Sequence, residues 1–328
     1  MLPAMSDYEG IYVVLEKIKR GKERVNIRKL RPEDDKEPVI TGGYIFKRDR
    51  LGPGEKGFVT SRGVKMVYVE PKERNITSAQ QQWLTNHLNE FESVLYGPNF
   101  RDPTNGYAKY IDVDSFVDYY WMVEMSKNID GFVSSVYMHK DRDGKITMGP
   151  IWDWDISFGN CFYLDGWKTN GWKMDQTVPA FLPWYWRLRE DPDFRQKCAD
   201  RWAQLRTNVF ATSNVISRVG EFAAYLNDAQ ARNYKRWTNL GTYVAPNYYI
   251  GKTYQEEVVW LKEWIKGRLA WIDSQSFPAP VLITTSNVQQ PTLNSQLTLV
   301  TMCSETGKIY YTLDGSDPRL PAGGSSRS

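Results

Sequence analysis

The sequence predicts an α+β protein in which a small β-rich lobe precedes a helix-rich second lobe. Three observations carry this prediction: short β-branched and aromatic runs before residue 70, a change to helical spacing from Thr77, and three long helical stretches after Pro192. With 328 residues, 41% of them hydrophobic, the chain is long enough to bury a sizeable core.

The first seventy residues are expected to form strands. Runs rich in Val, Ile, Tyr and Phe cover residues 10–18, 43–47 and 64–70, and this composition is typical of strands. The charged stretch 31–38 lies between the first two runs and contains two prolines. It therefore reads as a solvated connection.

Two helices are expected next. Thr77 is a candidate N-cap, and apolar residues recur at helical spacing from there to Gly97. Asp112 and Asp114 are candidate caps of a second helix that ends near Lys127. Its apolar residues recur at i, i+3, i+4 and i+7, so one face of this helix is expected to be buried.

A hairpin is expected in the middle of the chain. Its strands are predicted over 133–140 and 145–152, joined by a hydrophilic turn over 141–144 that ends in glycine. The second strand leads into Asp153 and Asp155. Because residues two apart on a strand point the same way, both carboxylates are expected to face one pocket.

The second lobe is predicted to continue with helices over 192–209, 213–236 and 254–274. The composition then shifts to Pro, Thr, Ser and Val. We therefore expect one domain over 1–276, followed over 277–328 by a linker and an incomplete β-sandwich module.

Composition excludes several classes of function. Lys and Arg total 42 against 39 Asp and Glu, so no strong basic field points to nucleic acid or to an anionic membrane. The three cysteines form no CxxC pair, which argues against a structural zinc site or a disulfide framework. No window approaches the roughly 18 apolar residues of a membrane span. A signal-peptide pattern is also absent from the first residues, and the strand pattern begins almost at once, so we expect an N-terminal segment to be missing.

The densest polar cluster combines Asn128 and Asp130 with Asp153, Asp155 and Asn160. Aspartates among aromatic residues need a compensating partner such as a cation, a metal or backbone N–H groups. Paired carboxylates with a nearby amide form the oxygen-rich set that Mg²⁺ prefers, with nucleotide phosphates completing the coordination. A further carboxylate, Asp130, could orient or deprotonate a hydroxyl nucleophile. Alternatively, Asp153 caps a turn and Asp155 pairs with an arginine.

Across roughly residues 8–275 the chain resembles the CotH family of atypical, spore-coat-type protein kinases. The most specific matching segment is 149–160, in which Asp-Trp-Asp is followed by Ile-Ser-Phe-Gly-Asn. The other matching segments, in the family's order, are 10–17, 42–47, 128–131 and 134–137.

The resemblance implies a divergent kinase-like, two-lobed fold that binds ATP with Mg²⁺ or Mn²⁺ and phosphorylates Ser or Thr of partner proteins. It implies that Asp130 is the catalytic-loop aspartate and that Lys47, with Lys17 as the alternative, contacts phosphate. It implies a metal held by Asp153 with support from Asp155 and Asn128. The sequence departs from two well-known phosphate cradles, because it contains neither a GxGxxG loop nor a GxxxxGK[ST] P-loop.

The segment after Pro278 resembles the start of the β-sandwich module at the C-terminus of chitobiase-like enzymes. Such modules accompany extracellular, often carbohydrate-active, bacterial proteins. This resemblance implies a location outside the cell or on the surface of the cell or spore, with partners that include surface or polysaccharide-associated proteins.

Two other functions are open on the residues alone. A glycoside hydrolase would draw an acid and a nucleophile or base from a set of carboxylates, beside tryptophan platforms. A catalytically silent binding scaffold would instead use the aromatic loop 161–186. The candidate carboxylates are Glu124, Asp130, Asp153, Asp155 and Asp165, and the candidate platforms are Trp152, Trp154, Trp167 and Trp172.

Overall fold

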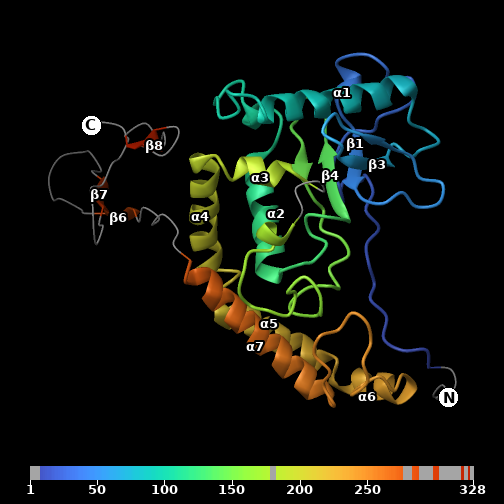
Figure 1. Cartoon of the computed structure of the whole chain (residues 1–328), viewed down its shortest axis with the longest axis vertical. Helices are drawn as coiled ribbons and strands as arrows, with labels where there is room; N and C mark the ends of the chain where they lie inside the picture. The colour runs from blue at the N-terminus through green and yellow to red at the C-terminus, as the bar shows by residue number, and fades with distance from the viewer. Residues whose placement is uncertain are drawn as a thin grey trace.

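The computed structural model describes residues 8–177 and 182–275, together with the backbone of four short strands nearer the C-terminus. The described part is a mixed α+β structure with seven α-helices and one five-stranded antiparallel sheet, in the order β2-β3-β1-β4-β5 (Figure 1). This confirms the α+β class. The kinase-like, two-lobed arrangement stays a prediction.

The sheet joins the first part of the chain to its middle. The strands are β1 (Tyr44–Arg48), β2 (Gly57–Val59), β3 (Lys65–Glu70), β4 (Val136–Lys140) and β5 (Thr147–Met148). The expected runs at 43–47 and 64–70 are confirmed as β1 and β3. Because β1 pairs with both β3 and β4, the segment that precedes β4 is placed beside the end of β1.

The two faces of the sheet bury different clusters. Tyr44 and Phe46 of β1 belong to the main core, which includes α1 (Ser78–Leu95). Ile45 lies on the opposite face and packs with Tyr137 in a small second cluster. This alternation is the ordinary consequence of strand geometry, and it decides which side of the sheet each charged residue of β1 faces.

The strand expected over residues 10–18 is wrong. The segment has no strand structure, and Val13 and Val14 are 80% and 96% exposed. It runs as an extended strap from the sheet to α6 (Asn227–Arg236), where the Ile11 amide donates to Asn233 Oδ1 at 3.0 Å (Figure 1). A β-branched run forms a strand only beside a pairing partner, and no described residue pairs with this one.

Helices make up most of the remainder. α1 begins at the predicted Thr77, whose side chain and Gln80 form a reciprocal capping box. α2 (Val113–Ser126) is capped by Asp112, is largely buried, and packs against α4 and α7. The other helices are α3 (Trp184–Leu188), α4 (Pro192–Arg206), α5 (Thr212–Tyr225) and α7 (Tyr254–Asp273).

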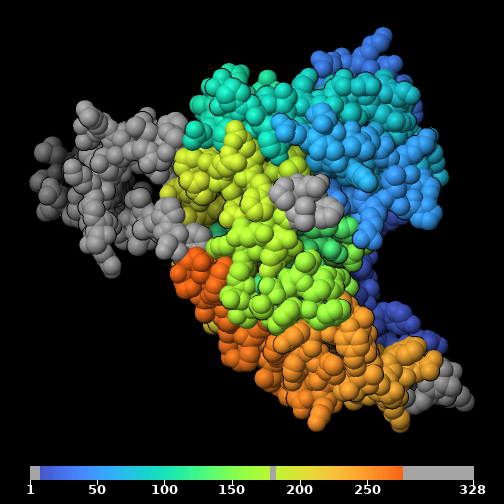
Figure 2. Space-filling model, viewed as in Figure 1, coloured from blue at the N-terminus to red at the C-terminus, as the bar shows by residue number. Residues whose placement is uncertain are grey.

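The expected helices over 192–209 and 254–274 correspond to α4 and α7. The single helix expected over 213–236 is two helices, α5 and α6, because the chain leaves helical geometry at Leu226, where ψ is −4°. In Figure 2, α5, α6 and the first part of α7 form the lower end of the molecule, next to the segment around residues 160–177.

The predicted hairpin exists but is shorter than expected. β4 begins at Val136, and β5 ends at Met148, just before Gly149 and Pro150. Proline has no N–H to continue the ladder. The next carboxylates therefore lie on a loop, and Asp153 has a left-handed φ of 64°. The expectation that strand alternation aims Asp153 and Asp155 into one pocket is wrong.

In the C-terminal segment, β6 (Ile283–Asn287) pairs with β7 (Thr298–Met302), and β8 (Arg319–Leu320) pairs with β9 (Gly324–Ser325), both antiparallel. The domain boundary predicted at 276/277 and the rest of the predicted β-sandwich module lie outside the described residues.

Candidate active site

Asp130 lies on the turn that follows α2. Lys127 ends the helix in the left-handed conformation, with φ 50° and ψ 42°. Asn128 is buried, and its Oδ1 accepts a hydrogen bond from the Asp130 amide at 2.9 Å. The Asp130 carbonyl accepts from the Val133 amide at 2.7 Å. These hydrogen bonds therefore fix the backbone of Asp130, and they do not involve its half-buried carboxylate.

The loop with Asp153 and Asp155 lies alongside this turn. Two backbone hydrogen bonds join them: Ile129 N–H to Ile156 O at 3.1 Å and Phe158 N–H to Ser126 O at 2.7 Å. Both aspartates are exposed, and Asp153 Oδ2 accepts from Ser135 Oγ at 3.2 Å.

Three carboxylates share one electrostatic environment. Burial raises the pKa of Asp130, and the negative charges of Asp153 and Asp155 raise this pKa further. Lys173 and Arg50 act in the opposite direction. The charges of Asp153 and Asp155 therefore belong to the electrostatic surroundings of Asp130.

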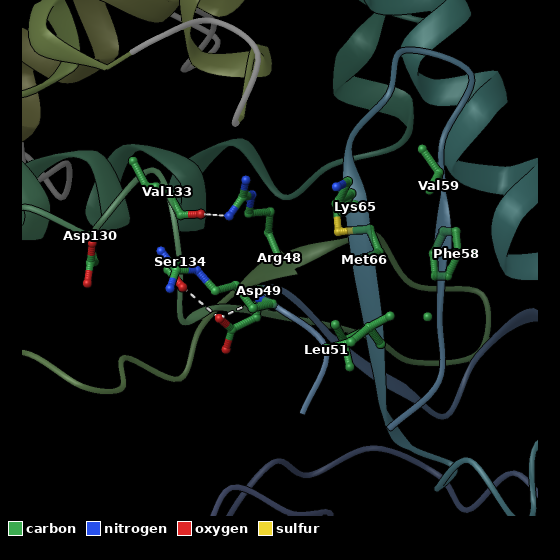
Figure 3. Close-up of a pocket in the computed structure, with 13 residues that line it drawn as sticks. Arg48, Asp49, Leu51, Phe58, Val59, Lys65, Met66, Asp130, Val133 and Ser134 are labelled. Carbon is green, nitrogen blue, oxygen red and sulfur yellow. Dashed lines mark hydrogen bonds between the residues drawn. The ribbon is translucent and has the colours of Figure 1, made fainter. Parts of the chain in front are cut away.

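A cavity of about 690 Å³ opens beside Asp130. Its walls come from β1, β2 and β3 on one side and from the segment 130–134 on the other (Figure 3). Three basic residues line it: Arg48, Arg50 and Lys65. Apolar side chains cover much of the rest, including Leu51, Phe58, Met66 and Val67.

Arg48 links the two walls of this cavity. It is buried, it donates a hydrogen bond to the Val133 carbonyl, and it interacts electrostatically with Asp130. The neighbouring Asp49 accepts from Ser134 Oγ at 2.6 Å (Figure 3). These contacts hold the end of β1 against the turn that carries Asp130.

Lys47 lies on the other face of β1. Its Nζ is 3.1 Å from Glu55 Oε1 and 3.3 Å from Asp49 Oδ2. Burial tends to lower the pKa of Lys47, but the hydrogen bond to Glu55 and the surrounding charges outweigh burial and raise it. Lys17 is exposed and lines a separate hollow of about 510 Å³ together with Tyr137. Neither lysine lines the cavity beside Asp130.

Sequence reasoning therefore missed Arg48, the buried cation of β1 that lines the cavity. The signal was present in the strand itself. Tyr44 and Phe46 are large apolar residues that belong to the core face, and alternation places residue 48 on that same face. The resemblance indicates Lys47, whereas the alternation of β1 places the next residue, Arg48, on the core face.

A second hollow, of about 530 Å³, is lined by Asp155 and Asn160 of the aspartate loop and by apolar side chains of α5 and α7. Asp130 therefore lines the first hollow and Asp155 lines the second, whereas Asp153 lines neither of the two.

Residues 4–272 match the family model described as CotH kinase protein. The chain belongs to this family. No match to a curated protein accompanies the family match. Within the described residues of this CotH chain, no helix combines the length and apolar character needed to cross a membrane.

The donor set at the CotH site suits a hard divalent cation, because Asp153 and Asp155 present exposed carboxylate oxygens. Asn160 is also exposed, and its amide nitrogen donates to the Asp155 carbonyl at 3.3 Å. Asn128, by contrast, uses its amide oxygen on the Asp130 backbone. No group of three acidic, His or Cys side chains among the described residues is already placed as a metal cage. The residues fit an ion shared with phosphate oxygens.

Two of the five carboxylates of the hydrolase alternative are engaged elsewhere. Glu124 is fully buried and accepts from two backbone amides and from Arg268 Nη2 at 3.0 Å. Asp165 pairs with Lys168 at 3.0 Å. Two tryptophans of the aromatic loop, both partly buried, contact other rings: the Trp167 ring stacks on Tyr248, and the Trp172 ring meets Trp271 edge-on.

Proposed function

We propose that the chain is a metal-dependent phosphotransferase that transfers the γ-phosphoryl group of ATP to a Ser or Thr hydroxyl of a protein partner. The observation that carries this proposal is that Asp130 lines one hollow, Asp155 lines a second, and the charges of Asp153 and Asp155 both act on Asp130. Phosphoryl transfer needs a donor site and an acceptor site that meet at a charged centre.

The cavity beside Asp130 suits the nucleotide. Arg48, Arg50 and Lys65 supply positive charge for the phosphates, and Leu51 and Phe58 supply apolar surface for the base. Asp153, Asp155 and Asn160 are the residues that would hold Mg²⁺ or Mn²⁺. When bound, the cation neutralises charge on the phosphate oxygens.

Asp130 is the residue proposed to act on the acceptor. Its carboxylate takes the proton of the Ser or Thr hydroxyl as the hydroxyl oxygen bonds to the γ-phosphorus, and the bond from that phosphorus to the β-phosphate oxygen breaks to release ADP. The second hollow reaches Asp155 and Asn160, which supports its use by the acceptor segment of the protein partner.

The partner is proposed to be a surface or polysaccharide-associated protein outside the cell. Only the resemblance of the C-terminal segment to modules of secreted proteins supports this part of the proposal.

Binding and turnover test the proposed function. In a thermal-shift series, ATP with Mn²⁺ should raise the melting temperature, whereas ATP with EDTA should not, because a ligand stabilises only the state that binds it. Phosphate transfer to a serine-containing protein should also disappear with EDTA. Release of reducing sugar that survives EDTA would instead support the hydrolase alternative, and an absence of both binding and turnover would support the silent scaffold.

A further inference from the structure

The second hollow, of about 530 Å³, differs in charge from the cavity beside Asp130. Among the described residues that line the hollow, two are acidic, Asp155 and Glu257, and none is basic. The cavity beside Asp130 has three basic residues in its lining. Because phosphate groups are bound by positively charged side chains and N–H donors, the second hollow suits a neutral or cationic ligand rather than a nucleotide.

One wall of this hollow is the apolar face of α5. Apolar residues recur along this face at helical spacing: Val215, Val219 and Phe222. Val215 and Val219 pack against the main core. Phe222 lies on the next turn and lines the hollow. The apolar face of α5 therefore continues beyond its contact with the core and into the hollow.

The segment 239–250 forms another wall, although it contains neither helix nor strand. Contacts with two neighbouring parts of the fold fix its position. The Phe162 amide, just after the aspartate loop, donates to the Pro246 carbonyl at 3.0 Å. The Tyr249 ring stacks on Trp260 of α7, with 4.7 Å between the ring centroids. Because this wall is already held in place, a ligand does not have to order it on binding.

Three large apolar side chains of the lining are exposed: Phe222 at 59%, Val244 at 43% and Ile250 at 41%. Exposed apolar residues that gather around one hollow are typical of a binding surface, whereas single ones are ordinary. The hollow also adjoins the candidate active site, because Asp155 and Asn160 belong to its lining. An apolar group bound in the hollow would therefore lie beside the aspartate loop.

We propose that this hollow binds a bulky apolar side chain, such as leucine or phenylalanine, that lies a few residues from the acceptor Ser or Thr of the protein partner. The apolar walls select this side chain, and the edge with Asp155 and Asn160 leads from it to the acceptor hydroxyl. Asp155 and Glu257 disfavour an acidic residue at the same position, because like charges repel. The inference rests on the proposed function and adds the sequence preference of the acceptor segment.

Peptide phosphorylation tests this preference. Serine peptides with a polar, uncharged background carry one leucine, placed in turn at each position on both sides of the serine, and are assayed with the full chain, ATP and Mn²⁺. At the preferred position leucine should lower KM about 10-fold and keep kcat within about 2-fold, because its burial stabilises bound substrate and transition state alike. Glutamate at that position should raise KM. A KM within about 2-fold at every position would overturn the proposal.

A matched pair of variants ties the preference to the hollow. Phe222 and Tyr225 are both exposed aromatic residues of α5, and of the two only Phe222 lines the hollow. Phe222→Ala should raise KM for the preferred leucine peptide about 5-fold and leave KM for the peptide without leucine unchanged. Tyr225→Ala should change neither KM. Equal effects of the two variants would overturn the assignment, and the peptide comparison needs no variant if Phe222→Ala does not fold.

Binding without turnover separates this inference from the proposed function. The same peptides with alanine in place of serine are titrated calorimetrically into the full chain without nucleotide. Leucine at the preferred position should tighten binding about 10-fold, and Phe222→Ala should remove this gain. If these results hold for a chain that transfers no phosphate, only the proposed function fails. Equal affinities or no detectable binding would overturn the inference. So would a dimer in sedimentation that Phe222→Glu dissociates, because a second copy would then occupy the hollow.

Discussion

Asp130 and Asp153 share a charged region but occupy different surroundings. Asp130 is half-buried on a turn fixed by Asn128, whereas Asp153 is exposed on a loop, where Ser135 Oγ donates to it. An exposed carboxylate is suited to a cation, and a half-buried carboxylate on a fixed turn is suited to act on one bond. The two residues should therefore fail in different ways.

Asp153→Asn should weaken Mn²⁺-dependent ATP binding by about 10-fold or more, whereas Asp130→Asn should keep binding within about 2-fold and lose about 10²–10⁴-fold in kcat. Isothermal titration and phosphotransfer rates measure the two effects. Asp165→Asn removes a carboxylate paired with Lys168 and serves as the control with both quantities unchanged. Equal loss of ATP binding in both site variants would contradict the division of roles.

The neighbouring cations of β1 provide a second test. Arg48 lines the cavity beside Asp130, and Lys47 lies on the opposite face with Glu55 and Asp49. Arg48→Met should weaken ATP binding by about 10-fold, since a hydrogen bond to a charged group contributes about 1.5–3 kcal/mol. Lys47→Met should leave ATP binding nearly unchanged and cost about 1–3 kcal/mol of folding free energy, because Asp49 and Glu55 lose their buried partner. The reverse result would restore Lys47, predicted from resemblance, as the phosphate contact.

Individual residues were predictable where local chemistry decides. Thr77 and Asp112 were recognised as helix caps because their side chains bond to nearby backbone amides. Asp130, Asp153 and Asp155 stood out because carboxylates among aromatic residues require a partner. The cavity beside Asp130 could not be found in this way, since its walls come from β1, β2 and β3 and from the segment 130–134, which are far apart in the chain.

At the scale of elements, the pair Glu124–Arg268 joins α2 to α7. Both side chains are almost completely buried, and Arg268 also donates to the carbonyls of Thr169 and Gly171. The loop that carries Lys173 therefore depends on this pair for its position.

Arg268→Met should destabilise the fold by about 3–5 kcal/mol, because it leaves a buried carboxylate without its charge partner. Denaturant titration at neutral pH measures the loss. Arg201→Met, which breaks the exposed pair of Arg201 with Asp118 at 2.6 Å, is the control and should cost about 0–1 kcal/mol. A similar loss of unfolding free energy in both variants would show that burial does not strengthen the contact between Glu124 and Arg268.

The same variant has a defined pH dependence. Burial raises the pKa of Glu124, and Arg268 opposes this rise. Without Arg268 the folded pKa rises further above the unfolded value, so the folded state binds the proton more tightly than the unfolded state. The deficit of Arg268→Met relative to wild type should therefore grow as pH rises above the wild-type folded pKa of Glu124, which already lies above the ordinary value, and should level off at lower pH. Unfolding free energies at a series of pH values measure it, and a deficit independent of pH would mean that the carboxyl does not titrate.

Elements with their own periodicity were predictable, and elements that depend on distant partners were not. α1, α4 and α7 follow from caps and helical spacing. The run at 10–18 has the composition of a strand but no pairing strand among the described residues. β5 ends just before Pro150, although the hydrophobic pattern continues beyond this proline. For these two elements, pairing decided against propensity.

At the scale of the whole molecule, strand pairing in the five-stranded sheet positions the residues of the candidate active site. β4 follows the turn of Asp130 directly and pairs with β1, which carries Arg48. Residues far apart in sequence thus become two walls of one cavity (Figure 3). Both walls consist of segments that the sequence analysis identified. The pairing of β1 with β4, which joins these walls, could not be predicted because the two strands are far apart in the chain.

The last prediction concerns the segment after α7. Leu269 and Ile272 near the end of α7 are fully buried, Ser274 closes the helix with its amide on the Ala270 carbonyl, and the family match ends at residue 272. Among the described residues, α7 therefore makes the last helical contribution to the hydrophobic core. A chain ending at Gln275 should keep one melting transition, with a loss of no more than about 1–2 kcal/mol, and should bind ATP with Mn²⁺ as the full chain does. A control ending after Trp264, which removes Leu269 and Ile272, should lose the transition. The chain ending at Gln275 keeps all of α7. If this chain also lost the melting transition, residues after Gln275 would be needed to complete the core.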